Sequence, residues 1–89
     1  MKEDVPIYQS IREVRQGTKL VSLIVAKNQH GYITKTFGGI KGLLTFEDAG
    51  ESHKIGQIIK AYVLFKKKDK GVALTISKKK AKEEREDNQ

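Results

Sequence analysis

HGYITKTFGGIKGLLT, residues 30–45, contains two short runs of strand-forming residues separated by a pair of glycines. The runs 31–36 and 40–45 have strand length, and Gly38-Gly39 supplies the backbone freedom of a tight turn, so the stretch predicts an antiparallel hairpin. A glycine followed by an apolar run recurs at 17–26, 56–65 and 71–77. Short runs separated by turn residues in this way predict an all-β protein, a small closed barrel of five strands.

Alternation in the last two runs predicts which side chains enter the core, because successive strand residues point to opposite faces. In 58–65 the expected core residues are Ile59, Ala61, Val63 and Phe65. Lys60 and Tyr62 then point outward. In the last strand the alternation places Val72, Leu74 and Ile76 inside and Ala73, Thr75 and Ser77 outside.

Length and composition indicate one domain flanked by two polar segments. The 89 residues are too few for a deep enzyme cleft. We expect a linker over 1–16 with a short helical turn at 10–15, a barrel domain over 17–80, and a charged tail over 81–89 that forms a frayed helix or coil. The polar stretch 46–55 predicts a one-turn helix or loop that plugs one end of the barrel.

The net charge of +7 is concentrated in one stretch, since residues 66–82 hold eight lysines and one aspartate. Such a cluster beside a barrel suggests a polyanionic partner, because neutralising phosphates releases counterions. A solvated surface that keeps the protein soluble is the alternative interpretation. The absence of cysteine excludes disulfides and thiolate metal sites and fits an intracellular protein.

Other functional classes find little support in the sequence. No apolar run approaches the length of a membrane span, and the polar start does not resemble a secretory signal, so we expect a soluble protein without a membrane partner. His30 and His53 lie far apart, and the carboxylates near Glu47 are better explained as flanking a short helix. We therefore expect no enzyme, no metal and no cofactor.

Several short motifs, taken in order, resemble the S1 RNA-binding domain, a member of the OB-fold class. The motifs are Gly17, His30-Gly31, Gly42-Leu43, Gly56-Gln57 and Ile76-Ser77. The resemblance covers Val14 to Lys80 and implies a five-stranded barrel with a short helical connection after the third strand.

Within that family, the hairpin over 35–44 is similar to repeats of the large eukaryotic ribosome-biogenesis scaffold that strings many S1 domains together. This resemblance implies a repeat that acts in rRNA processing in the nucleus and nucleolus. The implied partners are pre-rRNA and neighbouring S1 repeats or ribosome-assembly proteins, and the isolated domain is expected to be a monomer.

The RNA site that the resemblance implies is largely altered in this chain. The two aromatic places of the family fall on His30 and Ile33, its histidine place on Thr45, and its arginine place on Ala73. Tyr32 supplies a ring instead if the strand register differs by one residue, which exchanges the two faces of the strand. For Phe37 packing is the favoured role, and for Tyr62 partial exposure is expected. The full set of candidate RNA-binding residues is His30, Tyr32, Ile33, Lys35, Phe37, Lys41, Thr45, Lys60, Tyr62, Lys66, Lys67, Lys68, Asp69 and Lys70.

Three functions follow from these observations. The first is a non-catalytic module that binds single-stranded or structured RNA weakly and with little sequence preference. The second is a protein-interaction or spacer repeat that has lost most of its RNA site, as the altered positions suggest. A translation initiation factor of OB type is a third, minor alternative.

Overall fold

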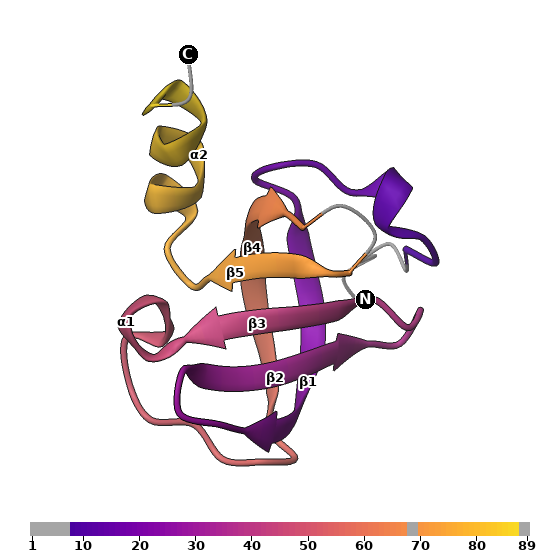
Figure 1. Cartoon of the computed structure of the whole chain (residues 1–89), viewed down its shortest axis with the longest axis vertical. Coiled ribbons are helices and arrows are strands. Elements are labelled where there is room, and N and C mark those ends of the chain that lie inside the picture. Colours follow the sequence, from indigo (N-terminus) through magenta and orange to yellow (C-terminus); the bar gives the residue numbers. More distant parts are fainter. Residues whose placement is uncertain (1–7, 68–69, 88–89) are drawn as a thin grey trace, which may run out of the picture.

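A computed structural model of the chain describes residues 8–67 and 70–87 and shows a closed five-stranded barrel with short helices (Figure 1). The strands are β1 (Lys19–Lys27), β2 (Gly31–Thr36), β3 (Lys41–Thr45), β4 (Ile58–Lys66) and β5 (Val72–Thr75). The helices are the 3₁₀ turn η1 (Ile11–Glu13), α1 (Phe46–Ala49) and α2 (Lys78–Asp87). The prediction of an all-β OB-fold barrel is confirmed.

The strands follow the order β1-β2-β3-β5-β4, and β4 pairs with β1 to close the barrel. Every pairing is antiparallel except that of β3 with β5, which is parallel and joins Gly42 to Val72 and Leu44 to Leu74. The expected β2–β3 hairpin is present, with Ile33 opposite Leu43 and Lys35 opposite Lys41.

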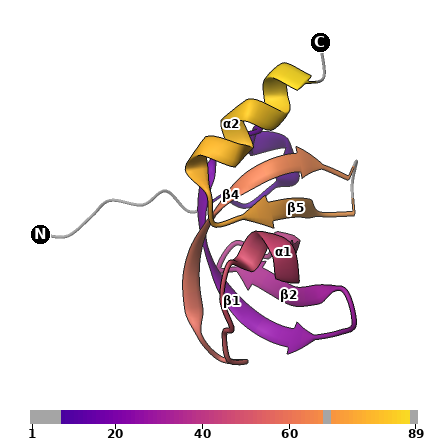
Figure 2. The ribbon, with the colours of Figure 1, turned by 90° about the vertical axis from the view of Figure 1, so that its left-hand side faces the viewer.

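The core fills the barrel from every strand. Its fully enclosed side chains include Ile24 of β1, Leu44 of β3, Val63 of β4 and Leu74 of β5. Helix α1 lies across one end of the barrel (Figure 2), and its Ala49 is completely buried. This helix is the plug expected between residues 46 and 55.

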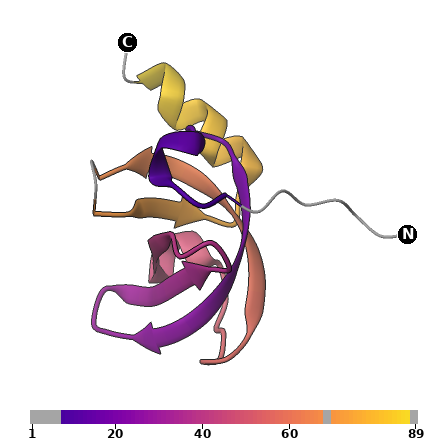
Figure 3. The ribbon, with the colours of Figure 1, turned by 90° about the vertical axis from the view of Figure 1, so that its right-hand side faces the viewer.

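The segment before β1 also packs against the barrel. It forms the 3₁₀ turn expected within 10–15, and it lies on the side of the molecule seen in Figure 3. Val14 is completely buried in the core, and Tyr8 and Ile11 pack against it. The packed unit therefore includes residues N-terminal to Gly17.

A β-bulge in β4 makes the prediction for Phe65 wrong. The pairing of β4 with β5 shifts between Val63 and Phe65, so that Leu64 is an extra residue. A bulge interrupts the alternation of a strand. Ile59, Ala61 and Val63 are buried as expected, whereas Phe65 is 48% exposed and Leu64 is buried.

Helix α2 changes the environment of the outer face of β5. Ala73 and Thr75 were expected to be solvent-facing, yet both are buried. For Ala73 the reason is that α2 places Ala81 against it and Leu64. Ile76 was expected in the core and is 39% exposed, since β5 ends at Thr75.

Polar contacts to other parts of the chain hold α2 and its approach. The Gln16 side-chain amide donates to the carbonyl of Ala81 at 2.8 Å, and Lys80 forms an ion pair with Asp48 of α1. Asp48 in turn accepts from the backbone N–H of Ile76 through its own carbonyl, at 3.1 Å. Of the two forms expected for the end of the chain, the helical one is found.

Candidate functional site

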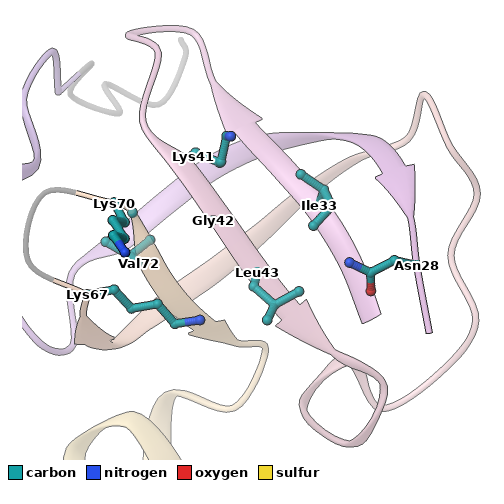
Figure 4. Close-up of a pocket in the computed structure, with 9 residues that line it drawn as sticks. Asn28, Ile33, Lys41, Gly42, Leu43, Lys67, Lys70 and Val72 are labelled. Carbon is teal, nitrogen blue, oxygen red and sulfur yellow. The ribbon is translucent and has the colours of Figure 1, made fainter. Parts of the chain in front are cut away.

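An open hollow of about 270 Å³ lies on the outer wall of the barrel, where β2, β3 and β5 run side by side (Figure 4). Its lining residues are Asn28, Ile33, Lys41, Gly42, Leu43, Lys67, Lys70, Gly71 and Val72. We call this site the lysine-rimmed hollow.

The floor of the hollow follows from strand register. Ile33 of β2 pairs with Leu43 of β3, and Leu43 pairs with Ala73 of β5, so these three residues form one row across the outer face. The neighbouring row contains Lys35 and Lys41, which are also partners. Figure 4 shows Ile33 and Leu43 side by side on their strands. The result is an aliphatic floor beside a pair of ammonium groups.

The β4–β5 connection supplies the opposite rim. The N–H of Lys67 donates to the carbonyl of Gly71 at 2.8 Å, and the N–H of Lys70 donates to the carbonyl of Lys67 at 2.9 Å. Gly71 has a φ of 140° and lies so close to β3 that a Cβ there would come within 2.6 Å of the carbonyl oxygen of Lys41. This close approach, which only glycine permits, brings the two loop lysines next to Lys41.

The β1–β2 turn forms the far end of the hollow. The Asn28 carboxamide oxygen accepts from the N–H groups of His30 and Gly31 at 2.8 and 3.0 Å. The N–H of Asn28 donates to the carbonyl of Gly31 at 2.9 Å. These bonds fix Asn28 beside the floor. His30 lies in the same turn, and its ring is exposed next to the Gln29 amide.

The structure brings together four of the residues predicted for the site: Ile33, Lys41, Lys67 and Lys70. Lys35 lies next to them through its pairing with Lys41. Lys68 and Asp69 lie outside the described residues.

Tyr32 is not available on the outer face. Its ring is 3% exposed inside the barrel, where the hydroxyl accepts from the N–H of His53 at 3.0 Å. The ring packs edge-on against Phe46 and His53, with centroids 5.4 and 5.6 Å apart. Of the two registers left open by the sequence, the one that points Ile33 outward is therefore present.

Other predicted residues have different roles or positions. Thr45 caps α1, since its hydroxyl oxygen accepts from the N–H of Asp48 and its O–H donates to the side-chain carboxylate of Asp48. Tyr62 is half-buried against the cluster beneath α2. Lys60 pairs with Val21 on the β1–β4 side, and the ammonium of Lys66 donates to the carbonyl of Ile11 at 3.4 Å.

Phe37 does not pack, contrary to the favoured expectation. It lies at the tip of the β2–β3 hairpin and is 76% exposed. The residue of this hairpin turn that enters the core is Ile40.

Five residues that line the hollow were not among the candidates: Asn28, Gly42, Leu43, Gly71 and Val72. Leu43 was recoverable, because a hairpin through Gly38-Gly39 places it opposite Ile33. Asn28 and Gly71 carry no periodic signal, since both act through loop geometry.

The hollow offers aliphatic contact and positive charge to a ligand. Among the residues that the structure describes, no three His, Cys, Asp or Glu side chains gather in a way that suits a metal ion. Within the same ranges, no helix is long and apolar enough to span a membrane. The chemistry of the hollow matches a ligand that combines negative charge with apolar surface.

Comparison with known proteins supports the fold. No protein-family model matches the chain, and no curated protein matches it. A solved structure described as a multidomain protein with nucleic acid binding domains from Streptococcus pneumoniae superposes with a TM-score of 0.63 at 16% sequence identity. The similarity covers 74% of this chain and 26% of the Streptococcus pneumoniae protein, so this chain matches about a quarter of the length of that protein. The chain therefore has the OB-fold, a barrel shared with that protein.

Proposed function

We propose that the chain is a non-catalytic RNA-binding module of S1 type. The observation that carries this proposal is the lysine-rimmed hollow, in which Lys41, Lys67 and Lys70 surround an aliphatic floor on the outer wall of the barrel. The similar solved structure is described as having nucleic acid binding domains, which supports the same class of ligand.

The composition of the hollow suits weak binding with little sequence preference. Lysine side chains contact phosphates without reading bases, because phosphates carry no sequence information. Ile33 and Leu43 offer apolar contact to any base. None of the described residues that line the hollow is aromatic, so the stacking energy of roughly 1–3 kcal/mol per base is missing from its floor.

The finer assignment follows the resemblance to the multi-S1 scaffold. In this proposal the chain is one repeat of a ribosome-biogenesis factor, acts on pre-rRNA and works in the nucleus and nucleolus. Linked repeats raise the effective concentration of each site, so a weak single site is sufficient for the assembly.

A protein-interaction repeat is the second candidate, and the family's altered positions favour it. Thr45 is engaged in capping α1, and Ala73 is covered by α2, so neither reaches the hollow as a polar group. In addition, Leu23 and Ile58 are cross-strand partners on the β1–β4 side and are 38% and 58% exposed.

A titration of the ¹⁵N-labelled protein with a short single-stranded RNA at low salt tests the proposal. We expect chemical-shift changes at Ile33, Leu43 and Gly71. If the resonances of these residues do not shift at millimolar RNA, the RNA-binding function is overturned.

Two triple variants separate local contact from general charge. Lys41→Glu/Lys67→Glu/Lys70→Glu is expected to abolish binding. The matched control reverses three exposed lysines away from the hollow: Lys19, Lys54 and Lys82. Equal loss in both variants would mean that net charge, and not the hollow, holds the RNA.

A further inference from the structure

Phe37 is the most exposed large apolar side chain among the described residues, at 76%. Single exposed apolar residues are common on protein surfaces, so exposure alone assigns no role. The turn that carries Phe37 and the charges beside it distinguish this ring.

Hydrogen bonds and close packing hold the hairpin tip. Thr36 donates its N–H to the carbonyl of Ile40 and accepts from the N–H of Gly39 through its own carbonyl, both at 3.0 Å. The hydroxyl oxygen of Thr36 also accepts from the N–H of Ile40 at 3.0 Å. Gly38 packs so closely on the preceding segment that a Cβ would lie 1.9 Å from the carbonyl oxygen of Tyr8. An ordered turn presents Phe37 to a ligand with little further loss of loop entropy.

The base of the hairpin is positively charged and joins the hollow. Lys35 and Lys41 are cross-strand partners, both are exposed, and Lys41 also lines the lysine-rimmed hollow. A chain of phosphates that leaves the hollow past Lys41 therefore meets the hairpin tip next. A nucleotide supplies both a negative group for these lysines and a flat ring for Phe37, whereas an apolar protein surface would have to cover both ammonium groups.

The two other exposed phenylalanine rings among the described residues are less suited to this role. Phe46 packs edge-on against Tyr32 and lies 5.9 Å from the Lys27 ammonium. Phe65 is 48% exposed, but it pairs with Ala73, which lies beneath α2 between Phe65 and the floor of the hollow.

We propose that Phe37 stacks on one unpaired base of the nucleic-acid strand bound in the lysine-rimmed hollow. The inference rests on the proposed function and deepens it, because stacking at the tip requires a base that is not enclosed in a duplex. The aromatic contact missing from the floor is thus provided at the end of the hairpin. Binding accordingly favours a single strand over a duplex of the same length.

A double-mutant cycle between protein and RNA tests this assignment. Phe37→Ala is expected to weaken binding of a labelled ten-nucleotide RNA by roughly fivefold to a hundredfold in fluorescence anisotropy. Phe37→Tyr keeps a ring and is expected to restore affinity. An abasic site at one RNA position should weaken binding to the native protein by a similar factor, and should have no effect on the Phe37→Ala variant.

A matched control and a direct probe complete the test. Phe65→Ala, which removes another exposed ring, is expected to change affinity by less than twofold. The chain contains no tryptophan, so Phe37→Trp places a single indole at the tip, and its emission should be quenched by RNA. Circular dichroism checks that each variant keeps the fold.

The outcomes separate this inference from the function on which it rests. If RNA binds and depends on Lys41 and Lys67, while Phe37→Ala binds equally well, the stacking role is wrong and a protein contact at the tip is favoured. Coupling of the abasic site to Phe65 would also overturn it. If the native protein binds no RNA, both proposals fail.

Discussion

Neutralising two lysines of the hollow should reduce the salt dependence of RNA binding by a calculable amount. Lys35, Lys41, Lys67 and Lys70 lie on or beside the floor. If each neutralises one phosphate of a single strand, the four contribute about −2.8 to the slope of log K against log salt, at roughly 0.7 per phosphate. The double variant Lys41→Gln/Lys70→Gln should therefore lower the magnitude of the slope by about 1.4.

The assay is an anisotropy titration of a labelled single-stranded RNA at several salt concentrations. Between 50 and 200 mM salt, four contacts predict a loss of affinity of about 50-fold, and two contacts predict a loss of about sevenfold. The control variant Lys54→Gln/Lys82→Gln has the same net charge and both changes lie off the hollow. A slope that changes equally in both variants, or in neither, would refute the reasoning.

Three further predictions concern the barrel itself. Gly31→Ala should lower stability by about 3 kcal/mol in urea unfolding, because its Cβ would lie 2.3 Å from the carbonyl oxygen of Leu44 and force β2 from β3; an unchanged midpoint would contradict this packing. Ser22→Ala should leave stability unchanged or raise it by about 1 kcal/mol in thermal unfolding, since within the described residues its buried hydroxyl has no hydrogen-bond partner; a clear loss would reveal a partner. Ala81→Glu should detach α2, because burying an unpaired charge costs several kcal/mol. Circular dichroism should show a loss of helix, while the NMR spectrum keeps the dispersed resonances of the β-strands. A retained helical signal would count against docking through Ala81.

The barrel was predictable from sequence because its strands are short, bounded by turn residues and regular in their alternation. The hairpin around Gly38-Gly39 and the inward face of Ile59, Ala61 and Val63 were read correctly for this reason. The bulge at Leu64 was not predicted, since the alternation of apolar and polar residues does not show where one extra residue is inserted.

Two other features depend on contacts that a local pattern does not contain. The lysine-rich end forms a docked helix, in which Ala81 meets Leu64 and Ala73 from distant strands and polar contacts reach Gln16 and Asp48. Tyr32 turns inward because its hydroxyl reaches the backbone of His53 across the barrel end. The lysines of the candidate site were predictable from charge and Ile33 from the family resemblance, whereas Asn28 and Gly71 depend on the shape of two loops.

The parallel pairing of β3 with β5 has a consequence for the dynamics of the barrel. It joins Gly42 to Val72, 30 positions apart in the chain, over only three residue pairs. Pairings between distant segments require closure of a long loop and tend to form late in folding. We expect this seam to be among the first to open, which native-state hydrogen exchange at Leu43 and Ala73 would register. Because the lysine-rimmed hollow spans the same seam, any ligand held there fastens the two strands together and should slow that exchange.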